Sequence, residues 1–306
     1  MTEGVPVVPA LDTTEQRNPR TLDIDTWPSE RVVKTLLAED EAGVRAAAAA
    51  APELARAVDL ALARLGEGGR VHYFGAGASG RLGVLDATEA TPTFGARPGL
   101  FTPHFPGGAA AVLDSGLDYE DARSLGEDDA AALTSGDVAV GITASGTTPY
   151  VAGALERARA AGALTVLITC NGSTSLTAAV DVAVVAPTGP EAVTGSTRLK
   201  AGTATKALLN AFSTALMVRS GRTYSNLMVN LVATNEKLGA RAVRILETVA
   251  GLGPADAAAT LARCGGDLRL AVVHALSGRP VDTCRRALTG TGVRAALDLL
   301  AGGHGG

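Results

Sequence analysis

The sequence predicts an α/β protein with a parallel five-stranded sheet, helices on both faces of the sheet, and a small C-terminal helical bundle. Between residues 70 and 185, short apolar runs bounded by glycine alternate with helical patterns, as in sheets whose parallel strands are joined by helices. The 306-residue chain is 46% hydrophobic but only 3% aromatic, so its core is expected to consist of closely packed helices rich in alanine and glycine. Beyond residue 250 only helical patterns remain.

The N-terminal part is predicted to be a disordered tail over residues 1–12 followed by helices. Ser29 is a suitable N-cap for a helix over Ser29–Leu37. The alanine-rich run Glu41–Leu65 predicts one or two long helices with a break near Pro52.

The central part carries the predicted sheet. Its apolar strand candidates are Arg70–Phe74, Leu100–Phe105, Val138–Thr143, Leu164–Thr169 and Asp181–Val185. The helices expected between them are Ser79–Thr88, Ala109–Leu125, Pro149–Ala161 and Ser173–Ala178. Ligands on such a sheet bind beyond the carboxyl ends of the strands, so we look for the site there.

The remainder is predicted to be helical. Expected helices are Thr197–Val218, Ser225–Thr248, Ala255–Cys264, Asp267–Ser277, Pro280–Ala287 and a fourth short C-terminal helix over Gly292–Leu300. Gly251-Leu-Gly-Pro254 has the composition of a linker. We therefore expect a main domain over residues 13–250 and a small helical domain over residues 251–306.

Charge and cysteine usage exclude several classes of protein. The net charge is −4 with no basic block, which argues against a nucleic-acid partner. No apolar run approaches the roughly 20 residues that a membrane span needs. Cys170, Cys264 and Cys284 show neither paired nor metal-ligand spacing, so we expect no metal site and a reducing compartment. Met1–Asp12 lacks the basic-then-apolar order of a signal peptide.

Two glycine-rich turns follow predicted strands and are candidates for binding a phosphosugar. In the first, Gly75-Ala-Gly-Ala-Ser-Gly-Arg-Leu-Gly83, the candidate contacts are Gly77, Ser79 and Gly80. In the second, Thr143-Ala-Ser-Gly-Thr-Thr-Pro-Tyr150, they are Ser145, Gly146, Thr147 and Thr148. Hydroxyls, backbone N–H groups and helix N-termini suit a phosphate, although Gly and Ser also make ordinary tight turns. The first turn also matches a dinucleotide fingerprint, but no acidic residue follows a second strand at the required distance.

Two glutamates are candidates for acid–base chemistry. Glu89 follows the first turn by about three helical turns, and Glu120 lies in the predicted helix Ala109–Leu125. Two carboxylates beside a phosphosugar can divide the acid and base roles when their environments separate their pKa values. The alternative is that both are solvated acids on helix surfaces.

A third polar block, Pro187–Thr203, precedes a long helix. Glu191, Ser196, Thr197 and Lys200 are its candidate phosphosugar contacts. Ser196 or Thr197 also suits an N-cap. Arg198 and Lys200 stand near a helix start, where the dipole disfavours cations, so either a bound anion or a salt bridge would explain them.

These motifs, taken in order, resemble the N-acetylmuramic acid 6-phosphate etherase family of the sugar isomerase (SIS) superfamily. The resemblance rests on the two glycine-rich turns and on the following stretches: Thr14-Glu-Gln-Arg-Asn-Pro19, Leu22-Asp-Ile-Asp25, Glu89-Ala-Thr-Pro-Thr-Phe-Gly95, Thr194–Thr203, Asn226-Leu-Met-Val229 and Thr234-Asn235. It covers roughly residues 13–250, and several independent motifs in order are more specific than any one of them.

The resemblance implies a SIS-type, flavodoxin-like fold and a cytoplasmic, cofactor-independent lyase acting in cell-wall recycling. Such an enzyme cleaves the lactyl ether of N-acetylmuramic acid 6-phosphate to N-acetylglucosamine 6-phosphate and D-lactate. In the resemblance, Glu89 matches the family's acid and Glu120 its base. It further implies a homodimer with sites near the subunit interface.

Departures from the family pattern keep other functions open. They are Ala78, Ala90, Thr91, Leu117 and Tyr119, and most lie next to the matched acid and base. The alternatives are a sugar-phosphate-sensing regulator without catalysis and a SIS enzyme, such as an aldose–ketose isomerase, acting on another phosphosugar. Release of lactate separates the etherase from both.

Overall fold

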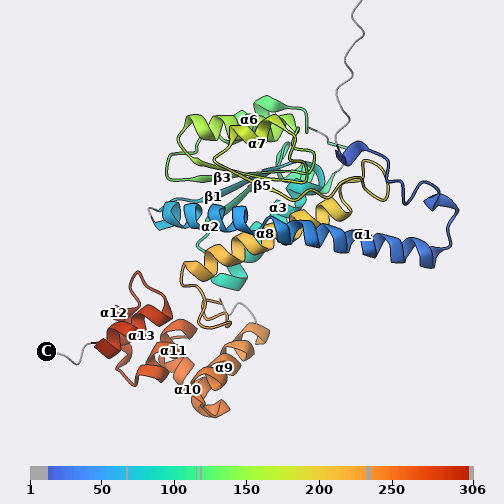
Figure 1. Cartoon of the computed structure of the whole chain (residues 1–306). Coiled ribbons are helices and arrows are strands. Elements are labelled where there is room, and N and C mark those ends of the chain that lie inside the picture. Colours follow the sequence, from blue (N-terminus) through green and yellow to red (C-terminus); the bar gives the residue numbers. More distant parts are fainter. Residues whose placement is uncertain (1–12, 67, 115, 118, 232–235, 303–306) are drawn as a thin grey trace, which may run out of the picture. The chain divides into compact units, whose positions relative to one another are not determined.

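The computed structural model describes residues 13–66, 68–114, 116–117, 119–231 and 236–302, so the predicted tail over residues 1–12 lies outside the described residues (Figure 1). The chain divides into two compact units, Met1–Asp86 with Phe101–Phe212 and Ala87–Leu100 with Ser213–Gly306. The helices α3 (Gly77–Phe94) and α8 (Lys200–Arg219) each begin in the first unit and end in the second. The predicted domain boundary at residue 251 stays a prediction.

The first unit contains the predicted five-stranded parallel sheet, which is confirmed. Its strands are β1 (Val71–Gly75), β2 (Phe101–His104), β3 (Val138–Thr143), β4 (Leu164–Thr169) and β5 (Val182–Val185). They lie in the order β2-β1-β3-β4-β5 and every pair is parallel. Every residue of β3 and β4 is buried, because helices cover both faces of the sheet. Strands that are buried on both faces are mostly apolar on both sides.

Helices cover the two faces of this sheet (Figure 1). The helices of the first unit are α1 (Ser29–Ala49), α2 (Ala51–Gly66), α4 (Gly108–Leu113), α5 (Arg123–Asp129), α6 (Pro149–Ala160) and α7 (Ser175–Ala179), with the first parts of α3 and α8. The predicted break near Pro52 is confirmed at Ala50. Pro149 starts α6, where a missing N–H costs nothing. Phe74, Tyr150 and Leu167 form part of the core between the sheet and α6.

The predicted helix over Ala109–Leu125 was wrong, because the described residues of this stretch are helical only in α4 and α5 at its two ends. The side chain of Asp114 accepts a hydrogen bond from the N–H of Gly116 (2.9 Å), which replaces the helical pattern after Leu113. Glu120 therefore lies in a turn before α5, not on a helix. The predicted helix over Ser225–Thr248 also begins too early, since α9 starts at Glu236.

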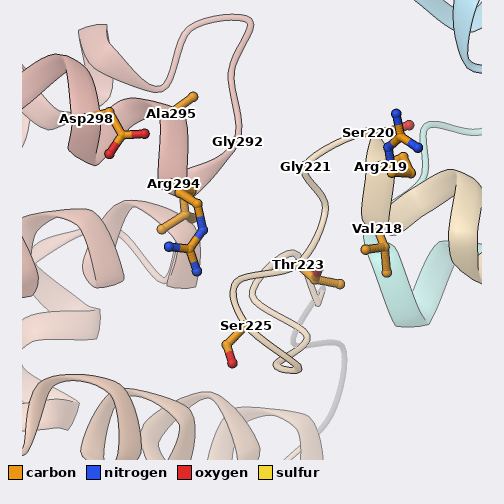
Figure 2. A pocket seen from close by; sticks show the side chains of 11 residues that line it. Val218, Arg219, Ser220, Gly221, Thr223, Ser225, Gly292, Arg294, Ala295 and Asp298 are labelled. Atoms are coloured by element: carbon orange, nitrogen blue, oxygen red, sulfur yellow. The ribbon is translucent and has the colours of Figure 1, made fainter.

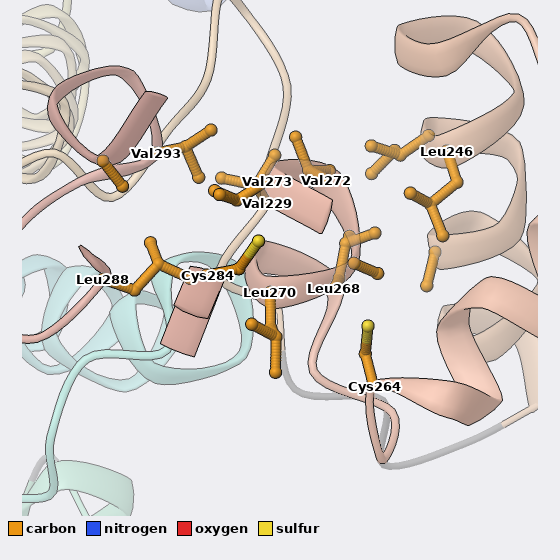
Figure 3. Close-up of a cluster of buried hydrophobic side chains, with 14 of the residues drawn as sticks. Val229, Leu246, Cys264, Leu268, Leu270, Val272, Val273, Cys284, Leu288 and Val293 are labelled. Atoms are coloured by element: carbon orange, nitrogen blue, oxygen red, sulfur yellow. The ribbon is translucent and has the colours of Figure 1, made fainter. Parts of the chain in front are cut away.

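The second unit is helical and has its own core (Figure 3). Its helices α9 (Glu236–Ala250), α10 (Pro254–Arg263), α11 (Leu268–Ser277), α12 (Val281–Ala287) and α13 (Val293–Gly302) confirm the helical C-terminal region, including its fourth short helix. Asp267 caps α11 by accepting from the N–H of Leu270 (3.0 Å). Buried Leu246, Leu268 and Val273 belong to the core. None of the described helices is long and apolar enough to cross a membrane.

Candidate functional site

The two glycine-rich turns meet at a cavity of about 250 Å³ in the first unit, which we call the loop pocket. It is lined by Glu15, Ala76, Gly77, Ala78, Ser79, Glu120, Thr143, Ala144, Ser145, Thr148, Gly195 and Thr197. The turns follow β1 and β3, which are neighbours in the sheet. The pocket thus stands at the carboxyl ends of adjacent parallel strands, where ligands of such sheets bind.

Hydroxyl groups of the second turn are linked to Glu120. The Oγ1 atoms of Thr143 and Thr148 lie 2.8 Å apart, and Thr148 Oγ1 donates to Glu120 Oε1 (3.1 Å). Ser145 Oγ accepts from the N–H (3.2 Å) and the hydroxyl (3.0 Å) of Thr147. These bonds place the Glu120 carboxylate among the hydroxyls of the second turn, and the hydroxyl of Ser145, which accepts in both of its bonds with Thr147, keeps a proton to donate.

Two helices begin at the loop pocket. The first residue of α3 is Gly77, and α6 follows Thr148 directly. Their N-termini add partial positive charge and backbone N–H groups. Among the described residues that line the pocket there is no Lys, Arg or His. A phosphate here would be held by hydroxyls and helix dipoles.

Three positions in the two turns are occupied by glycine for different structural reasons. Gly77 has φ +51°, and a Cβ there would lie 4.0 Å from Glu120 Oε2 in the pocket. A Cβ on Gly80 would lie 2.2 Å from the carbonyl oxygen of Gly75, so glycine allows α3 to approach β1. Gly146 has φ +76°, and its Cβ would lie 2.4 Å from Thr174 Cγ2. Gly80 and Gly146 are thus explained by packing within the fold.

The predicted site residues are only partly brought together. Those that line the loop pocket are Gly77, Ser79, Glu120, Ser145, Thr148 and Thr197. Glu89 is an exposed residue of α3 and belongs to the second unit. Ser196 lies in the same turn as Thr197 but is not among the lining residues. The motif residues Thr234 and Asn235 lie outside the described residues.

Glu191 and Lys200 take part in a buried network instead of lining the loop pocket. The two carboxylate oxygens of Glu191 accept from the backbone N–H groups of Ala201 (2.9 Å) and Lys200 (3.3 Å) at the start of α8, and burial raises the pKa of Glu191. Lys200 Nζ lies 2.5 Å from Glu39 Oε2. Burial alone would raise the pKa of Glu39, but hydrogen bonds from Lys200 and Arg20 lower it. Of the two explanations for Lys200, the structure shows the salt bridge.

Glu15 is a lining residue to which the sequence analysis assigned no role. A Cβ on Gly195, which has φ +75°, would lie 3.2 Å from Glu15 Oε2. The segment that carries Glu15 is tied to the loop before α8, since Thr21 Oγ1 donates to the carbonyl oxygen of Ala192 (2.8 Å). The sequence feature that could have indicated Glu15 is the N-terminal motif Thr14–Pro19. Its residue types and spacing do not by themselves indicate a binding or catalytic role.

The second unit contains a separate cavity of about 610 Å³ beside the end of α8 and the start of α13 (Figure 2). Its lining includes Arg219, Thr223, Ser225, Arg294 and Asp298, and none of the predicted site residues. The described residues of the chain contain no group of three or more His, Cys, Asp or Glu side chains arranged to hold a metal ion.

Comparison with known proteins identifies the family. Residues 117–215 match the SIS domain, and residues 53–159 match the glucokinase regulatory protein N-terminal SIS domain. A phosphoheptose isomerase structure from Francisella tularensis aligns with 61% of this chain and 96% of its own at 16% identity, with a TM-score of 0.45.

Similarity to curated etherases extends over nearly the whole chain. The N-acetylmuramic acid 6-phosphate etherase of Thermobifida fusca is 53% identical over 86% of this chain and 87% of its own. The enzyme of that name from Rubrobacter xylanophilus is 47% identical over 93% and 95%, and that from Salmonella typhimurium is 44% identical over 93% and 97%. The chain therefore belongs to the N-acetylmuramic acid 6-phosphate etherase family.

Proposed function

We propose that this protein is a carbon–oxygen lyase that cleaves the D-lactyl ether of N-acetylmuramic acid 6-phosphate. The products are N-acetylglucosamine 6-phosphate and D-lactate, and the reaction serves the recycling of peptidoglycan amino sugars. The observation that carries the proposal is 44–53% identity, over about nine-tenths of the chain, to relatives named for this activity. The loop pocket supports it with a carboxylate beside two phosphate-type turns.

The phosphate group is proposed to bind to the hydroxyls of the loop pocket. Ser79, Ser145 and Thr197 supply donors, and the N-termini of α3 and α6 supply partial positive charge. Thr148 also lines the pocket, but its hydroxyl proton is donated to Glu120. This arrangement orients the sugar with its phosphate at the turns, so that the carbon skeleton extends toward Glu120.

Glu120 is proposed to be the base. When the sugar ring is open, the aldehyde at C1 acidifies the proton on C2, and a carboxylate can remove it. The hydrogen bond from Thr148 holds the Glu120 carboxylate in place. The C2–H electrons then form the C2–C3 double bond, and the C3–O bond breaks with its electron pair going to the ether oxygen.

Glu89 is proposed to be the acid, on the resemblance of its motif to the family's acid motif. It donates a proton to the departing ether oxygen, so that lactate leaves as an alcohol. Water then adds across the double bond, with hydroxyl at C3 and a proton at C2, which gives the second product. The sum is one water consumed for each ether cleaved.

A homodimer in the cytoplasm is part of this proposal. On α1, Val33, Leu37 and Val44 are exposed and share one helix face, since they are spaced by four and seven residues. Such a stripe suits a contact between two copies of the chain. Cys170, Cys264 and Cys284 are free and buried, in keeping with a reducing compartment. Sedimentation and cell fractionation test these two statements.

The test of the function is release of D-lactate from N-acetylmuramic acid 6-phosphate by the purified protein. We expect wild-type protein to release lactate and Glu89→Gln to abolish release. Glu30→Gln is the matched control, because Glu30 is an exposed glutamate paired with Lys34 on the helix surface. No lactate from wild-type protein would refute the proposal.

A sugar-phosphate sensor is the second candidate, favoured by the match of residues 53–159 to a regulatory SIS domain. It requires binding of the phosphosugar without turnover. Calorimetry with N-acetylmuramic acid 6-phosphate, combined with the lactate assay, distinguishes the two functions.

A further inference from the structure

Another cavity, of about 160 Å³, adjoins the loop pocket, and we call it the arginine cavity. It is lined by Ala76, Gly77, Arg81, Phe105, Pro106, Leu117, Tyr119 and Glu120. Ala76, Gly77 and Glu120 line both cavities. A molecule bound in the loop pocket can therefore extend past Glu120 into the arginine cavity.

The two cavities differ in charge. The loop pocket has the carboxylates of Glu15 and Glu120, whereas the arginine cavity has a guanidinium. Within the described lining of both cavities, Arg81 is the only cation. The remaining wall of the arginine cavity is largely apolar, with Phe105, Pro106 and Leu117. This combination suits a small carboxylate that bears an apolar substituent.

The guanidinium of Arg81 is held in a fixed orientation. Its Nε donates to the carbonyl oxygen of Val112 (2.8 Å) and its Nη2 to that of Ala111 (3.4 Å). Its Cζ atom lies 5.3 Å from the centre of the Phe105 ring. An arginine has five N–H donors, so these two bonds do not exhaust its capacity for a carboxylate.

We propose that the arginine cavity is the subsite for the lactyl group of the substrate and that Arg81 binds the lactyl carboxylate. The proposal rests on the proposed function and extends it to the leaving group. In the substrate the lactyl ether is on C3, next to the C2 carbon whose proton Glu120 removes. The leaving group must consequently lie close to Glu120. Of the two cavities that Glu120 lines, the arginine cavity offers a counter-charge for the lactyl carboxylate.

Two further side chains belong to the wall of this subsite. Leu117 and Tyr119 line the arginine cavity beside Glu120. A Cβ on Gly107 would lie only 2.7 Å from Tyr119 Cδ2, so the lack of a side chain at Gly107 leaves room for the Tyr119 ring. Together with Phe105 and Pro106, these two side chains form the wall available to the methyl group of lactate.

The experiment compares two ligands that differ only in the lactyl group. Arg81→Gln is assayed for kcat/KM with N-acetylmuramic acid 6-phosphate and for inhibition by N-acetylglucosamine 6-phosphate. We expect kcat/KM to fall about ten- to hundredfold, the range for hydrogen bonds to a charged group. The inhibition constant should stay within about twofold. Arg159→Gln is the matched control, since Arg159 also donates to a carbonyl oxygen, that of Ala179, but lines neither cavity.

A substrate analogue with a carboxamide in place of the lactyl carboxylate separates recognition from structural support. Wild-type protein should prefer the carboxylate by about tenfold, and Arg81→Gln should lose this preference. A variant that kept the preference while losing activity toward both substrates would overturn the proposal, because Arg81 would then only support α4. A weaker binding of N-acetylglucosamine 6-phosphate to Arg81→Gln would also overturn it and assign Arg81 to the phosphate.

Failure of the proposed function gives a different result. Calorimetry measures the binding of both sugars to wild-type protein and to Arg81→Gln, without any need for turnover. A wild-type protein that bound the lactyl sugar more tightly but released no lactate would refute the etherase, and loss of that difference in Arg81→Gln would still support the subsite. Equal binding of the two sugars by wild-type protein would overturn the subsite.

Discussion

Replacing Lys200 with methionine tests whether its buried salt bridge stabilises the first unit. The Lys200 side chain is 2% exposed and that of Glu39 is 8% exposed, with 2.5 Å between Nζ and Oε2. Loss of one partner from a buried pair costs about 3–5 kcal/mol, because the other charge stays buried. Glu39 keeps its hydrogen bonds from Arg20, so we expect a loss of about 3 kcal/mol in the free energy of unfolding.

The assay is urea unfolding at pH 7, with Lys34→Met as the matched control. Lys34 pairs with Glu30 four residues away, but the two side chains are 75% and 77% exposed. Surface pairs of this kind contribute about 0.3–0.5 kcal/mol, so the control should unfold almost as wild-type protein does. An equal effect of the two substitutions would refute the argument from burial.

The contribution of the Glu39–Lys200 pair to the free energy of unfolding is expected to depend on pH. Because the hydrogen bonds from Lys200 and Arg20 lower the pKa of Glu39, ionised Glu39 stabilises the folded state above the pKa of the unfolded carboxyl. This contribution is lost as pH falls through the lowered pKa. The difference in unfolding free energy between wild type and Lys200→Met should therefore shrink on acidification below about pH 4. A difference independent of pH would assign the loss to packing of the side chain.

Three further substitutions address the loop pocket and the second turn beside it. Glu120→Gln should abolish exchange of the C2 proton with solvent, measured by NMR in deuterium oxide, and exchange at the wild-type rate would remove Glu120 as the base. Ser145→Ala should weaken inhibition by inorganic phosphate about fivefold or more, as expected for one hydrogen bond of about 1 kcal/mol or slightly more. An unchanged inhibition constant would count against the second turn as a phosphate site. Gly146→Ala should lower the unfolding free energy by about 2 kcal/mol, since φ is +76° and the new Cβ would lie 2.4 Å from Thr174 Cγ2. Wild-type stability in urea unfolding would mean that the turn adjusts without strain.

The strands and the glycine-rich turns were predictable because their signals are local. A buried parallel strand must be apolar on both faces, and Val138–Thr143 and Leu164–Thr169 have that composition. The helix over Ala109–Leu125 was mispredicted because its composition is helical while Asp114 and Gly116 form a competing turn. Arg81 of α3 also stabilises the end of α4, because it donates to the carbonyl oxygens of Val112 and Ala111.

The candidate site was predictable at the two turns and at Glu120 and Thr197, but not at Glu15. Glu15 belongs to the N-terminal segment, and only the folded chain places it beside Gly195. Glu15 is too far from the turns in the sequence for a helix or strand period to relate them. The arginine cavity likewise depends on side chains from α3, the end of β2 and the segment before Glu120.

Local sequence patterns were enough to predict the parallel sheet, the turns that end two of its strands and the hydroxyls that those turns carry. They could not say whether Lys200 faces a ligand or a carboxylate. That was decided by Glu39, 161 residues earlier in the chain. The physical reason is that a charged side chain is satisfied by whichever opposite charge the fold brings within a few ångströms, and that neighbour comes from tertiary packing.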